Sequence, residues 1–503
     1  MTLTSPSTTP VAQVPEEGIT GAALSELLAA QQRAFLAEGP PSAAVRIDRI
    51  DRLTAALLEH ADELTAALNA DFGNRPEANS LSSDILGAMS DVTDVRENLE
   101  AWMADVEIPA AAAKGLPTHI QNRPKGVVGI IGPWNFPVSL VFQPAVEAFA
   151  AGNRVMIKFS EVPSRTAEVF ARAVATRFPQ DEAVVVRGGT ETSVAFSELP
   201  FDHLFFTGSP GVGRHVAAAA GRNLTPVTLE LGGKNPVVVG PDADVQVAAE
   251  RVSAARMMNG GQLCLCPDYV LVPEDKVEAF VGAFRTAMQG YFPAYRENPD
   301  VVTLVDDRNF ARVKGLVDDA RAKGAEVITM VPEDEQAALP DAATRRMPPT
   351  LLLGVTDEMT IAHEEVFGPV ISVLPYGTVR EAIDYITAKP HPLAAYWYGD
   401  DTAEFREFVR RTTSGGVTRN DMALHFGIEG APFGGVGQSG SGAYHGKAGF
   451  DTFSHRRTIT QSALPFGVAP SAMPPYTTEK RDQLRGAVAQ ALTAVRKQLG
   501  ESD

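Results

Sequence analysis

Apolar and polar positions repeat with two different periods along this chain. Between residues 21 and 103 the apolar positions recur at helical spacing. They predict a helix that ends at Pro40, a second over 44–70 and a third over 80–102. The Ser-, Thr- and Pro-rich residues 1–20 come first, and we expect them to be disordered.

From residue 126 short apolar runs alternate with helical segments. Strands are predicted at 127–131, 153–158, 183–187, 204–206 and 227–230, and in a second block at 236–239, 269–272, 327–329, 370–374 and 394–397. This alternation is typical of parallel sheets covered by helices, so the fold class is α/β. Such sheets bind ligands at the carboxyl ends of their strands.

Two further regions depart from this alternation of strands and helices. Residues 104–125 contain prolines and an alanine run, which favour a hairpin that leaves the domain and pairs with another subunit. Residues 431–503 begin rich in glycine, become rich in proline, and end in a helix predicted over 478–499.

Composition narrows the class of protein. A chain of 503 residues suggests two or three domains, and 44% hydrophobic with 21% charged residues is ordinary for a soluble globular protein. The net charge of −18 argues against nucleic acid and anionic membranes as partners, because both are bound by basic patches. Two cysteines, no signal-like N-terminus and no membrane-length apolar run predict a cytoplasmic protein without a membrane span.

Both cysteines, Cys264 and Cys266, lie in the segment 259–267. The glycines ahead of Cys264 let a ligand approach the backbone closely, and Pro267 fixes the turn behind. Taken alone, the pair favours inert packing, because a free cysteine packs as a small hydrophobe. We expect no metal, because the chain offers no matching Cys/His pair elsewhere.

Strand ends carry further candidates. Asn135 follows the first predicted strand, where its amide either donates to developing negative charge or stabilises its own turn. The glycine-rich segment 206–213 opens a helix, whose N-terminal amides can hold phosphate, although the spacing is not Gly-x-Gly-x-x-Gly. A glycine-rich turn that binds no phosphate is the alternative.

Three carboxylates also follow strands or occupy turns. Glu161, near Lys158, suits ribose hydroxyls or a surface ion pair. Glu230 lies between leucines, which suits a desolvated general base or a paired structural glutamate. Glu365 shares a turn with Phe367, and an ordinary solvated turn is the alternative. Together the candidates suggest nucleotide-assisted covalent catalysis with a cysteine nucleophile.

Four motifs, in their order along residues 20–460, resemble the NAD(P)-dependent aldehyde dehydrogenases. They are Pro-Trp-Asn-Phe-Pro around Asn135, Leu-Glu-Leu-Gly-Gly-Lys around Glu230, Gly-Gln-Leu-Cys ending at Cys264, and Glu-Glu-Val-Phe-Gly-Pro around Glu365. The segment 442–455 resembles the class-three branch of that family. Segments at 71–75, 199–203, 225–228 and 267–271 are most similar to its bacterial coniferyl aldehyde dehydrogenase members.

The resemblance implies a domain plan. It comprises a Rossmann-type cofactor domain over 21–103 and 126–231, an α/β catalytic domain over 232–430, a β-strand oligomerisation arm over 104–125, and a return of 431–503 to the cofactor and oligomerisation region. It also implies a homodimer. The substrate implied is a small-molecule aldehyde that is hydrophobic, either aromatic like coniferyl aldehyde or medium- to long-chain aliphatic.

The resemblance also implies roles for individual residues. Cys264 would attack the aldehyde, Asn135 would hold the oxyanion, and Glu230 would activate the water that hydrolyses a thioester. The cofactor contacts implied are Trp134, Lys158, Glu161, Gly208, Ser209, Gly213, Leu231, Glu365 and Phe367. A carboxylate at Glu161 favours a free ribose 2′-hydroxyl, hence NAD, although class-three relatives often accept NADP as well.

Three positions depart from the family or vary within it. Phe159 stands where proline is usual, Cys266 replaces an alanine, and the loop 421–430, expected at the substrate entrance, differs among members. Two other functions stay open, a CoA-acylating dehydrogenase and a non-catalytic binding or structural protein on the same fold. Glu230 argues against the first, and the intact Asn135, Glu230 and Cys264 argue against the second. Reversible oxidation of the cysteine pair is a further alternative, against a buried passenger at Cys266.

Overall fold

The computed structural model describes residues 14–500, which form two compact units. The first comprises the chain up to Ala104 and Asn122–His455. The second comprises Asp105–Gln121 and the chain from Arg456. Every candidate site residue lies in the first unit.

The N-terminal helices are α1 (Ala22–Glu38), α2 (Ala43–Glu59) and α3 (Ala61–Phe72). The single helix predicted over 44–70 is therefore wrong. At His60 the backbone leaves helical geometry, with φ −110° and ψ 15°, and α3 starts from there. Hydrophobic periodicity continues across this break, since both helices bury the same kind of apolar face, so the sequence pattern did not reveal it.

The helix predicted over 80–102 is also wrong in its first half. The structure has α4 (Glu77–Ser80), the π-helical η1 (Leu81–Leu86), the 3-10 helix η2 (Gly87–Met89) and α5 (Val92–Met103). Asp84 of η1 is fully buried, pairs with Arg75 at 2.7 Å and accepts the backbone N–H groups of Val138 and Ser139. These buried polar contacts of Asp84 lie in the irregular stretch, and the spacing of apolar residues in the sequence does not indicate them.

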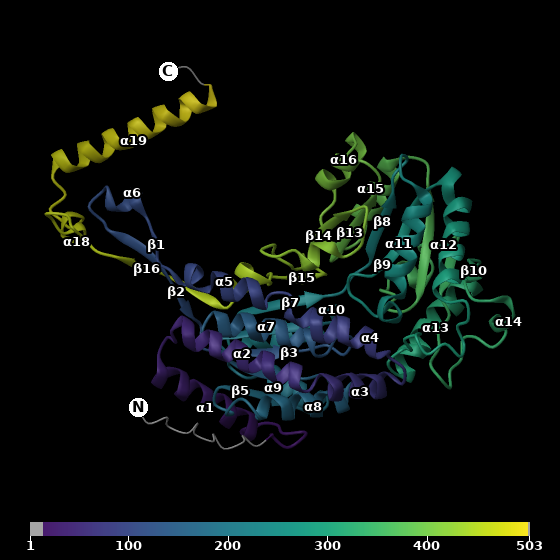
Figure 1. The fold of residues 1–503 in the computed structure, drawn as a ribbon. Helices are drawn as coiled ribbons and strands as arrows, with labels where there is room; N and C mark the ends of the chain where they lie inside the picture. Colours follow the sequence, from purple (N-terminus) through teal and green to yellow (C-terminus); the bar gives the residue numbers. More distant parts are fainter. Residues whose placement is uncertain (1–13, 501–503) are drawn as a thin grey trace. The chain divides into compact units, whose positions relative to one another are not determined.

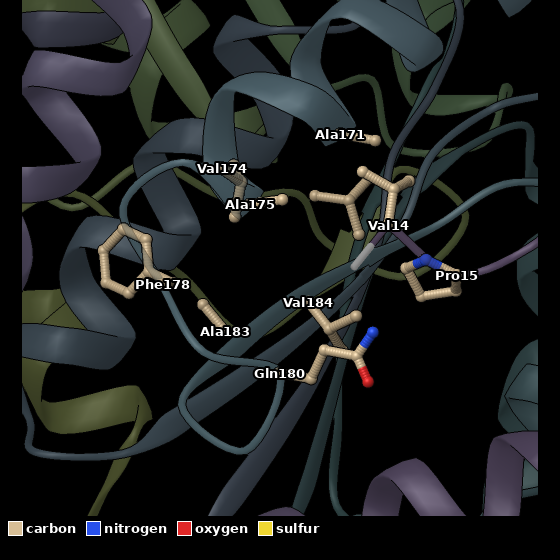
Figure 2. Close-up of a pocket in the computed structure, with 10 residues that line it drawn as sticks. Val14, Pro15, Ala171, Val174, Ala175, Phe178, Gln180, Ala183 and Val184 are labelled. Carbon is tan, nitrogen blue, oxygen red and sulfur yellow. The ribbon is translucent and has the colours of Figure 1, made fainter. Parts of the chain in front are cut away.

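Disorder was predicted over 1–20, and residues 1–13 of this segment lie outside the described residues. At Gly18 the prediction does not hold, because the Gly18 N–H donates to the Arg187 carbonyl at 3.0 Å. Val14 lies with α8 (Ser164–Ala175) beside a hollow of about 10 Å³ (Figure 2). That volume suits about one water molecule, so the hollow is no substrate site.

The first sheet has the order β15-β7-β6-β3-β4-β5 and is parallel apart from β15. Its strands are β3 (Val127–Ile131), β4 (Arg154–Lys158), β5 (Ala183–Val186), β6 (His203–Gly208), β7 (Val227–Leu231) and β15 (Gly440–Ser441). Its helices are α7 (Ser139–Ala150), α8, α9 (Thr190–Ser197) and α10 (Pro210–Arg222). The strands of this sheet were predicted to within two residues, except β15, which was not predicted.

The second sheet has the order β10-β11-β12-β9-β8-β13-β14 and is parallel except for β10 against β11 (Figure 1). Its strands are β8 (Asn235–Val239), β9 (Pro267–Pro273), β10 (Glu326–Thr329), β11 (Thr350–Leu353), β12 (Val370–Tyr376), β13 (Ala394–Tyr398) and β14 (Gly416–Arg419). The longer helices beside it are α11 (Val245–Met257), α12 (Val277–Tyr291), α13 (Asp307–Ala322), α15 (Val379–Thr387) and α16 (Ala403–Arg411). Its short elements are η3 (Met258–Gly261), η4 (Glu274–Lys276), α14 (Glu333–Gln336), η5 (Thr360–Ala362), η6 (Leu424–Gly427) and α17 (Gly446–Thr452).

One cluster of buried apolar side chains joins the two sheets. It includes Val128 and Ile130 of β3 as well as Val237 of β8, Val270 of β9 and Tyr396 of β13. A shared core of this kind holds two α/β layers as one body. The expected fold class, two α/β domains with parallel sheets, is confirmed.

The second unit is described by itself. β1 (Val106–Glu107) and β2 (Thr118–Pro124) pair antiparallel around α6 (Pro109–Ala112), and β16 (Ser454–Thr460) completes their sheet. The chain ends in α18 (Val468–Ser471) and α19 (Thr478–Leu499), and α19 buries no side chain. Over residues 14–500 no helix is long and apolar enough to cross a membrane.

Candidate active site

Asn135 lies in the turn that follows β3 and is 3% exposed. Its side-chain amide donates to the Gln262 carbonyl at 3.1 Å, and its own carbonyl accepts from Asn259 at 3.1 Å. Both partners belong to the segment that leads into Cys264. The turn after the first sheet and the cysteine segment beside the second sheet are thus joined by two buried hydrogen bonds.

The cysteine segment has a backbone that few residues tolerate. Asn259, Gly260 and Gly261 have φ values of 50°, 64° and 77°, in the left-handed region. A Cβ at Gly261 would lie 2.3 Å from the Gly368 carbonyl oxygen, so only glycine fits there. The glycines ahead of the thiol are explained by backbone geometry as well as by space for a ligand.

Buried amides fix the rest of the segment. The Gln262 side chain donates to the carbonyls of Asn259 and Thr303 and accepts from the Val305 N–H. Asn235 of β8 donates to the Cys264 carbonyl at 2.6 Å and to the Cys266 carbonyl at 3.0 Å. The Cys264 backbone is therefore held from both sides before any ligand binds.

The two thiols differ in their surroundings. Cys264 is half-buried, and burial raises the pKa of its thiol to about 12, with the charges of Glu365 and Glu230 adding to the shift. Cys266 is buried, its thiol donates to the Ala255 carbonyl at 3.4 Å, and burial raises its pKa to about 11. Both thiols are neutral at physiological pH, and Cys266 packs into the core.

Glu230 lies in β7, opposite Gly440 of β15, and is 4% exposed. Burial raises the pKa of its carboxyl group well above the usual range. Neither carboxyl oxygen has a hydrogen-bond partner among the side chains and backbone of residues 14–500. A buried carboxyl group without a protein partner is costly unless it serves a reaction or binds water.

Glu365 directs its carboxyl group at the backbone that follows β7. A Cβ at Gly232 would lie 2.1 Å from Oε2 of Glu365, so this glycine makes room for the carboxyl group. Burial, and then the charge of Asp268, raise the pKa of Glu365 to about 8. Asp268 itself pairs with Lys234 and accepts the Val366 N–H at 2.9 Å.

Lys158 ends β4 and is 1% exposed, with Nζ donating to the Phe159 carbonyl at 2.7 Å. Burial lowers its pKa to about 8, and Glu161, which is exposed, opposes the shift. Phe159, in the position where proline is usual, is buried and packs against Phe170 with ring centroids 5.6 Å apart. The departure from the family pattern is thus accommodated in the core.

The segment 208–213 starts α10. Ser209 is the N-cap, and its hydroxyl accepts the Val212 N–H at 3.4 Å. A Cβ at Gly213 would lie 2.7 Å from the Leu231 side chain, so this glycine lets α10 approach β7 closely. A Cβ at Gly208 would lie 2.6 Å from a neighbouring ring, that of Phe206. The two glycines therefore have packing reasons besides any role with phosphate.

Trp134 and Phe367 form an aromatic contact beside these groups. Their ring centroids lie 5.2 Å apart, edge to face, and both side chains are partly exposed. Phe367 has φ 46°, which is rare for a side chain of its size. Such strain occurs where a site fixes a residue in place.

The charged and polar groups near the strand ends fit a dinucleotide. The α10 N-terminus and Lys158 suit phosphates, because both attract anions. The carboxylates of Glu161 and Glu365 suit ribose hydroxyls. In the described part of the chain no group of three or more His, Cys, Asp or Glu side chains is placed to hold a metal ion.

Aromatic side chains gather around the segment 425–445. Phe426 contacts Phe433 and His445 at 4.9 Å and 4.7 Å between ring centroids, and Tyr444 contacts His445 at 4.3 Å. His425 lies parallel to Phe433 and hydrogen-bonds to Thr418. Burial raises the pKa of Tyr444, and the charges of Glu230, Glu147 and Cys264 add to the shift, so Tyr444 lies within electrostatic range of these groups.

Sequence reasoning missed one buried group near Glu230. Glu147 of α7 is fully buried and accepts the His445 N–H at 2.8 Å. It is the only charged residue in a helix whose side chains are all buried. That contrast was visible in the sequence, because a lone carboxylate in an apolar run needs a partner or a task.

Comparison with known proteins identifies the family of the chain. The profile of the "Aldehyde dehydrogenase family" matches residues 2–459. A "Probable coniferyl aldehyde dehydrogenase" of Caulobacter vibrioides is 47% identical over 474 residues, 93% of this chain and 97% of that protein. A "Coniferyl aldehyde dehydrogenase" of Pseudomonas sp. is 42% identical, over 87% of this chain and 90% of that protein.

A solved structure shows the same fold. The P. syringae AldA indole-3-acetaldehyde dehydrogenase, in complex with NAD+ and IAA, superposes with a TM-score of 0.79. The two sequences are 27% identical, and the match covers 88% of this chain and 89% of that one.

Proposed function

The chain belongs to the aldehyde dehydrogenase family, and we propose that it oxidises a hydrophobic aldehyde to its carboxylic acid by covalent catalysis at Cys264. One observation carries the proposal most. Asn135 from the first sheet is hydrogen-bonded to the segment that presents Cys264 from the second, beside the unpartnered carboxyl group of Glu230.

The first step is attack by the thiol. Because burial holds the pKa of Cys264 near 12, its S–H proton must pass to a base as the sulfur forms its bond to the carbonyl carbon. Glu230, whose own pKa is raised, accepts that proton when it is ionised. The carbonyl electrons move to oxygen, where the second N–H of the Asn135 amide and the Cys264 backbone N–H hold the negative charge.

NAD, when bound, supplies the hydride acceptor for this reaction. The residues that would hold it are Lys158, Glu161, Gly208, Ser209 and Gly213 around the adenosine and phosphates, and Trp134, Leu231, Glu365 and Phe367 around the nicotinamide riboside. Their task is to position it and to exclude water, while the oxidised carbon stays on Cys264 as a thioester.

The last step is hydrolysis. Before this step Glu230 releases the proton that it took from the thiol. A water molecule then adds to the thioester while the Glu230 carboxylate takes one of its protons. The C–S bond breaks to release the carboxylic acid, and that proton passes from Glu230 to the Cys264 sulfur. A CoA-acylating enzyme needs no such base, so a carboxyl group at position 230 supports the hydrolytic reaction over this alternative.

The aromatic cluster around residues 425–445 supports an aromatic substrate. The partly exposed rings of His425 and Phe426, which contact the buried Phe433 and His445, offer a place where an aryl group can pack. We therefore favour an aromatic aldehyde of the coniferyl type over a medium- or long-chain aliphatic aldehyde. The relatives from Caulobacter and Pseudomonas carry names that agree with this choice.

A homodimer and a cytoplasmic location are part of the same proposal. The strand pair of β1 and β2 and the exposed helix α19 would supply the contacts between subunits. A monomeric mass in solution contradicts the dimer.

One assay tests the proposed function. The purified protein is mixed with NAD and a panel of aromatic and aliphatic aldehydes, and NADH formation is followed with and without CoA. We expect NADH without CoA, fastest with coniferyl-type aldehydes. A strict need for CoA contradicts hydrolysis, and no NADH from any aldehyde, with either NAD or NADP, favours a non-catalytic role.

A further inference from the structure

A line of buried ionisable side chains starts at Glu230 and does not belong to the reaction described so far. Glu147 of α7 is fully buried, His445 ahead of α17 is 2% exposed, and Asp91 ahead of α5 is 7% exposed. α5, α7 and α17 pack against one another, so the three residues lie close together in the first unit.

The contacts along this line are specific. Oε1 of Glu147 accepts the His445 N–H at 2.8 Å, and a Cβ at Gly449 would lie 1.9 Å from Oε2. The imidazole Nε2 of His445 lies 3.9 Å from Oδ2 of Asp91. The missing Cβ at Gly449 therefore makes room for the carboxyl group of Glu147 beside α17.

Several polar atoms along the line have no protein partner. Within residues 14–500, none is found for either oxygen of Glu230, Oε2 of Glu147, Nε2 of His445 or Oδ2 of Asp91. No lysine or arginine of the described chain forms an ion pair with Glu147, Glu230 or Asp91. Buried acids in this arrangement can share protons through water instead of being neutralised by cations.

The pKa values fall from Glu147 to Asp91. Burial raises the pKa of Glu147 well above its usual range, with Asp91 and Glu230 adding to the shift. Burial, then the charges of Asp94 and Glu429, raise the pKa of Asp91 only to about 6. Burial lowers the pKa of His445 to about 4, so its ring is neutral at pH 7. Besides Asp94 and Glu429, Tyr444 also faces these residues, and its pKa is raised by burial and then by Glu230 and Glu147.

We propose that Glu147 is a proton-relay residue that carries the proton taken up by Glu230 toward Asp91 and the solvent. The inference rests on the proposed function, because in each turnover Glu230 must lose the proton taken from the thiol before it can act as the base of hydrolysis. The O–H bond of Glu230 breaks, and one forms at Glu147 as Glu147 passes its own proton, through water beside His445, to the Asp91 carboxylate. Asp91 then releases it to solvent, and no oxidant or reductant is involved.

Glu147 also has a structural role, which the test must distinguish from proton transfer. His445 has φ 78°, and its N–H is fixed by Oε1 of Glu147. Glu147→Gln keeps an acceptor for that N–H and the shape of the side chain but cannot pass a proton. Asp91→Asn interrupts the same route at its outer end, outside the contacts that hold the His445 backbone.

The experiment is a rapid-mixing measurement of NADH with an aldehyde that the wild-type enzyme oxidises. We expect Glu147→Gln to give a full first-turnover burst, followed by a steady-state rate lowered roughly tenfold or more, with an unchanged Tm. Asp91→Asn should lower the steady-state rate in the same way. It should also abolish the fall in rate that the wild-type enzyme shows as the pH drops below about 6, where Asp91 becomes protonated.

A second readout needs no cofactor. The infrared spectrum of the wild-type protein should contain a protonated-carboxyl band at neutral pH that Glu147→Gln lacks. Wild-type steady-state rates in both variants overturn the relay while leaving the proposed function intact. A lost burst or a lowered Tm in Glu147→Gln, with a wild-type rate and pH profile in Asp91→Asn, makes Glu147 structural only. If the wild-type enzyme forms no NADH, the proposed function itself fails.

Discussion

The Asn135 side-chain amide donates to the Gln262 backbone carbonyl at 3.1 Å, just ahead of Cys264. This bond connects the turn after the first sheet to the cysteine segment at the second. It leaves one N–H of the amide for a substrate oxygen. The position of this proposed oxyanion donor relative to the cysteine segment is thus set by the protein itself.

Replacement of Asn135 by alanine removes this donor. Loss of one oxyanion donor costs about 3 kcal/mol of transition-state stabilisation, so we expect kcat to fall roughly a hundredfold with a smaller change in KM. The measurement is NADH formation under saturating aldehyde. A kcat near that of the wild-type enzyme would exclude Asn135 from the chemistry.

The thiol of Cys264 should react slowly with alkylating agents at neutral pH. Its pKa is raised to about 12, so the reactive thiolate is scarce and its fraction rises roughly tenfold per pH unit. The charge of Glu365 contributes to that shift, so Glu365→Gln should lower the pKa and speed alkylation at a given pH. Iodoacetamide labelling followed by peptide mass mapping measures this. Fast, pH-independent labelling of the wild-type thiol would contradict it.

Gly261→Ala should destabilise the protein. The residue has φ 77°, and the added Cβ would lie 2.3 Å from a backbone oxygen, which costs about 1–3 kcal/mol. Gly282→Ala in α12 is the matched control, because a Cβ there meets nothing within 4 Å. The control should be neutral or stabilising by up to about 1 kcal/mol. Equal Tm values for both variants would refute the steric argument.

Glu161→Gln tests the cofactor choice. A carboxylate near the adenine ribose favours a 2′-hydroxyl and repels a 2′-phosphate, so NAD should be preferred by the wild-type enzyme. We expect the variant to lose part of that preference, with KM for NAD rising and KM for NADP falling. A wild-type enzyme that is more active with NADP would contradict the assignment of Glu161.

Most strands of the two α/β sheets were predictable because they are largely apolar, whereas β11, β14 and β15 were not predicted. β3 and β4 have every residue buried, and buried strands leave short apolar runs in the sequence. Boundaries at His60 and in η1 were not predictable, since a buried ion pair and a local backbone angle determine them. Neither one leaves a periodic signal.

The candidate site was predictable only in part. Motifs that resemble those of the aldehyde dehydrogenase family marked Cys264, Glu230 and Asn135 as candidates, at glycine- and proline-containing turns near strand ends. Glu147 lies inside α7 and Asp91 ahead of α5, so neither belongs to such a motif. Only the packing of α5, α7 and α17 brings them together.

The most direct test of the account is the covalent intermediate at Cys264. In Glu230→Gln neither the thiol nor the hydrolytic water has its proposed base. Mixing with NAD and aldehyde should therefore give at most one NADH per site, formed more slowly than in the wild-type enzyme, with slow turnover afterwards. Mass mapping of the quenched protein should then find the acyl group on Cys264. An acyl group on Cys266, or wild-type steady-state turnover in this variant, would contradict the account.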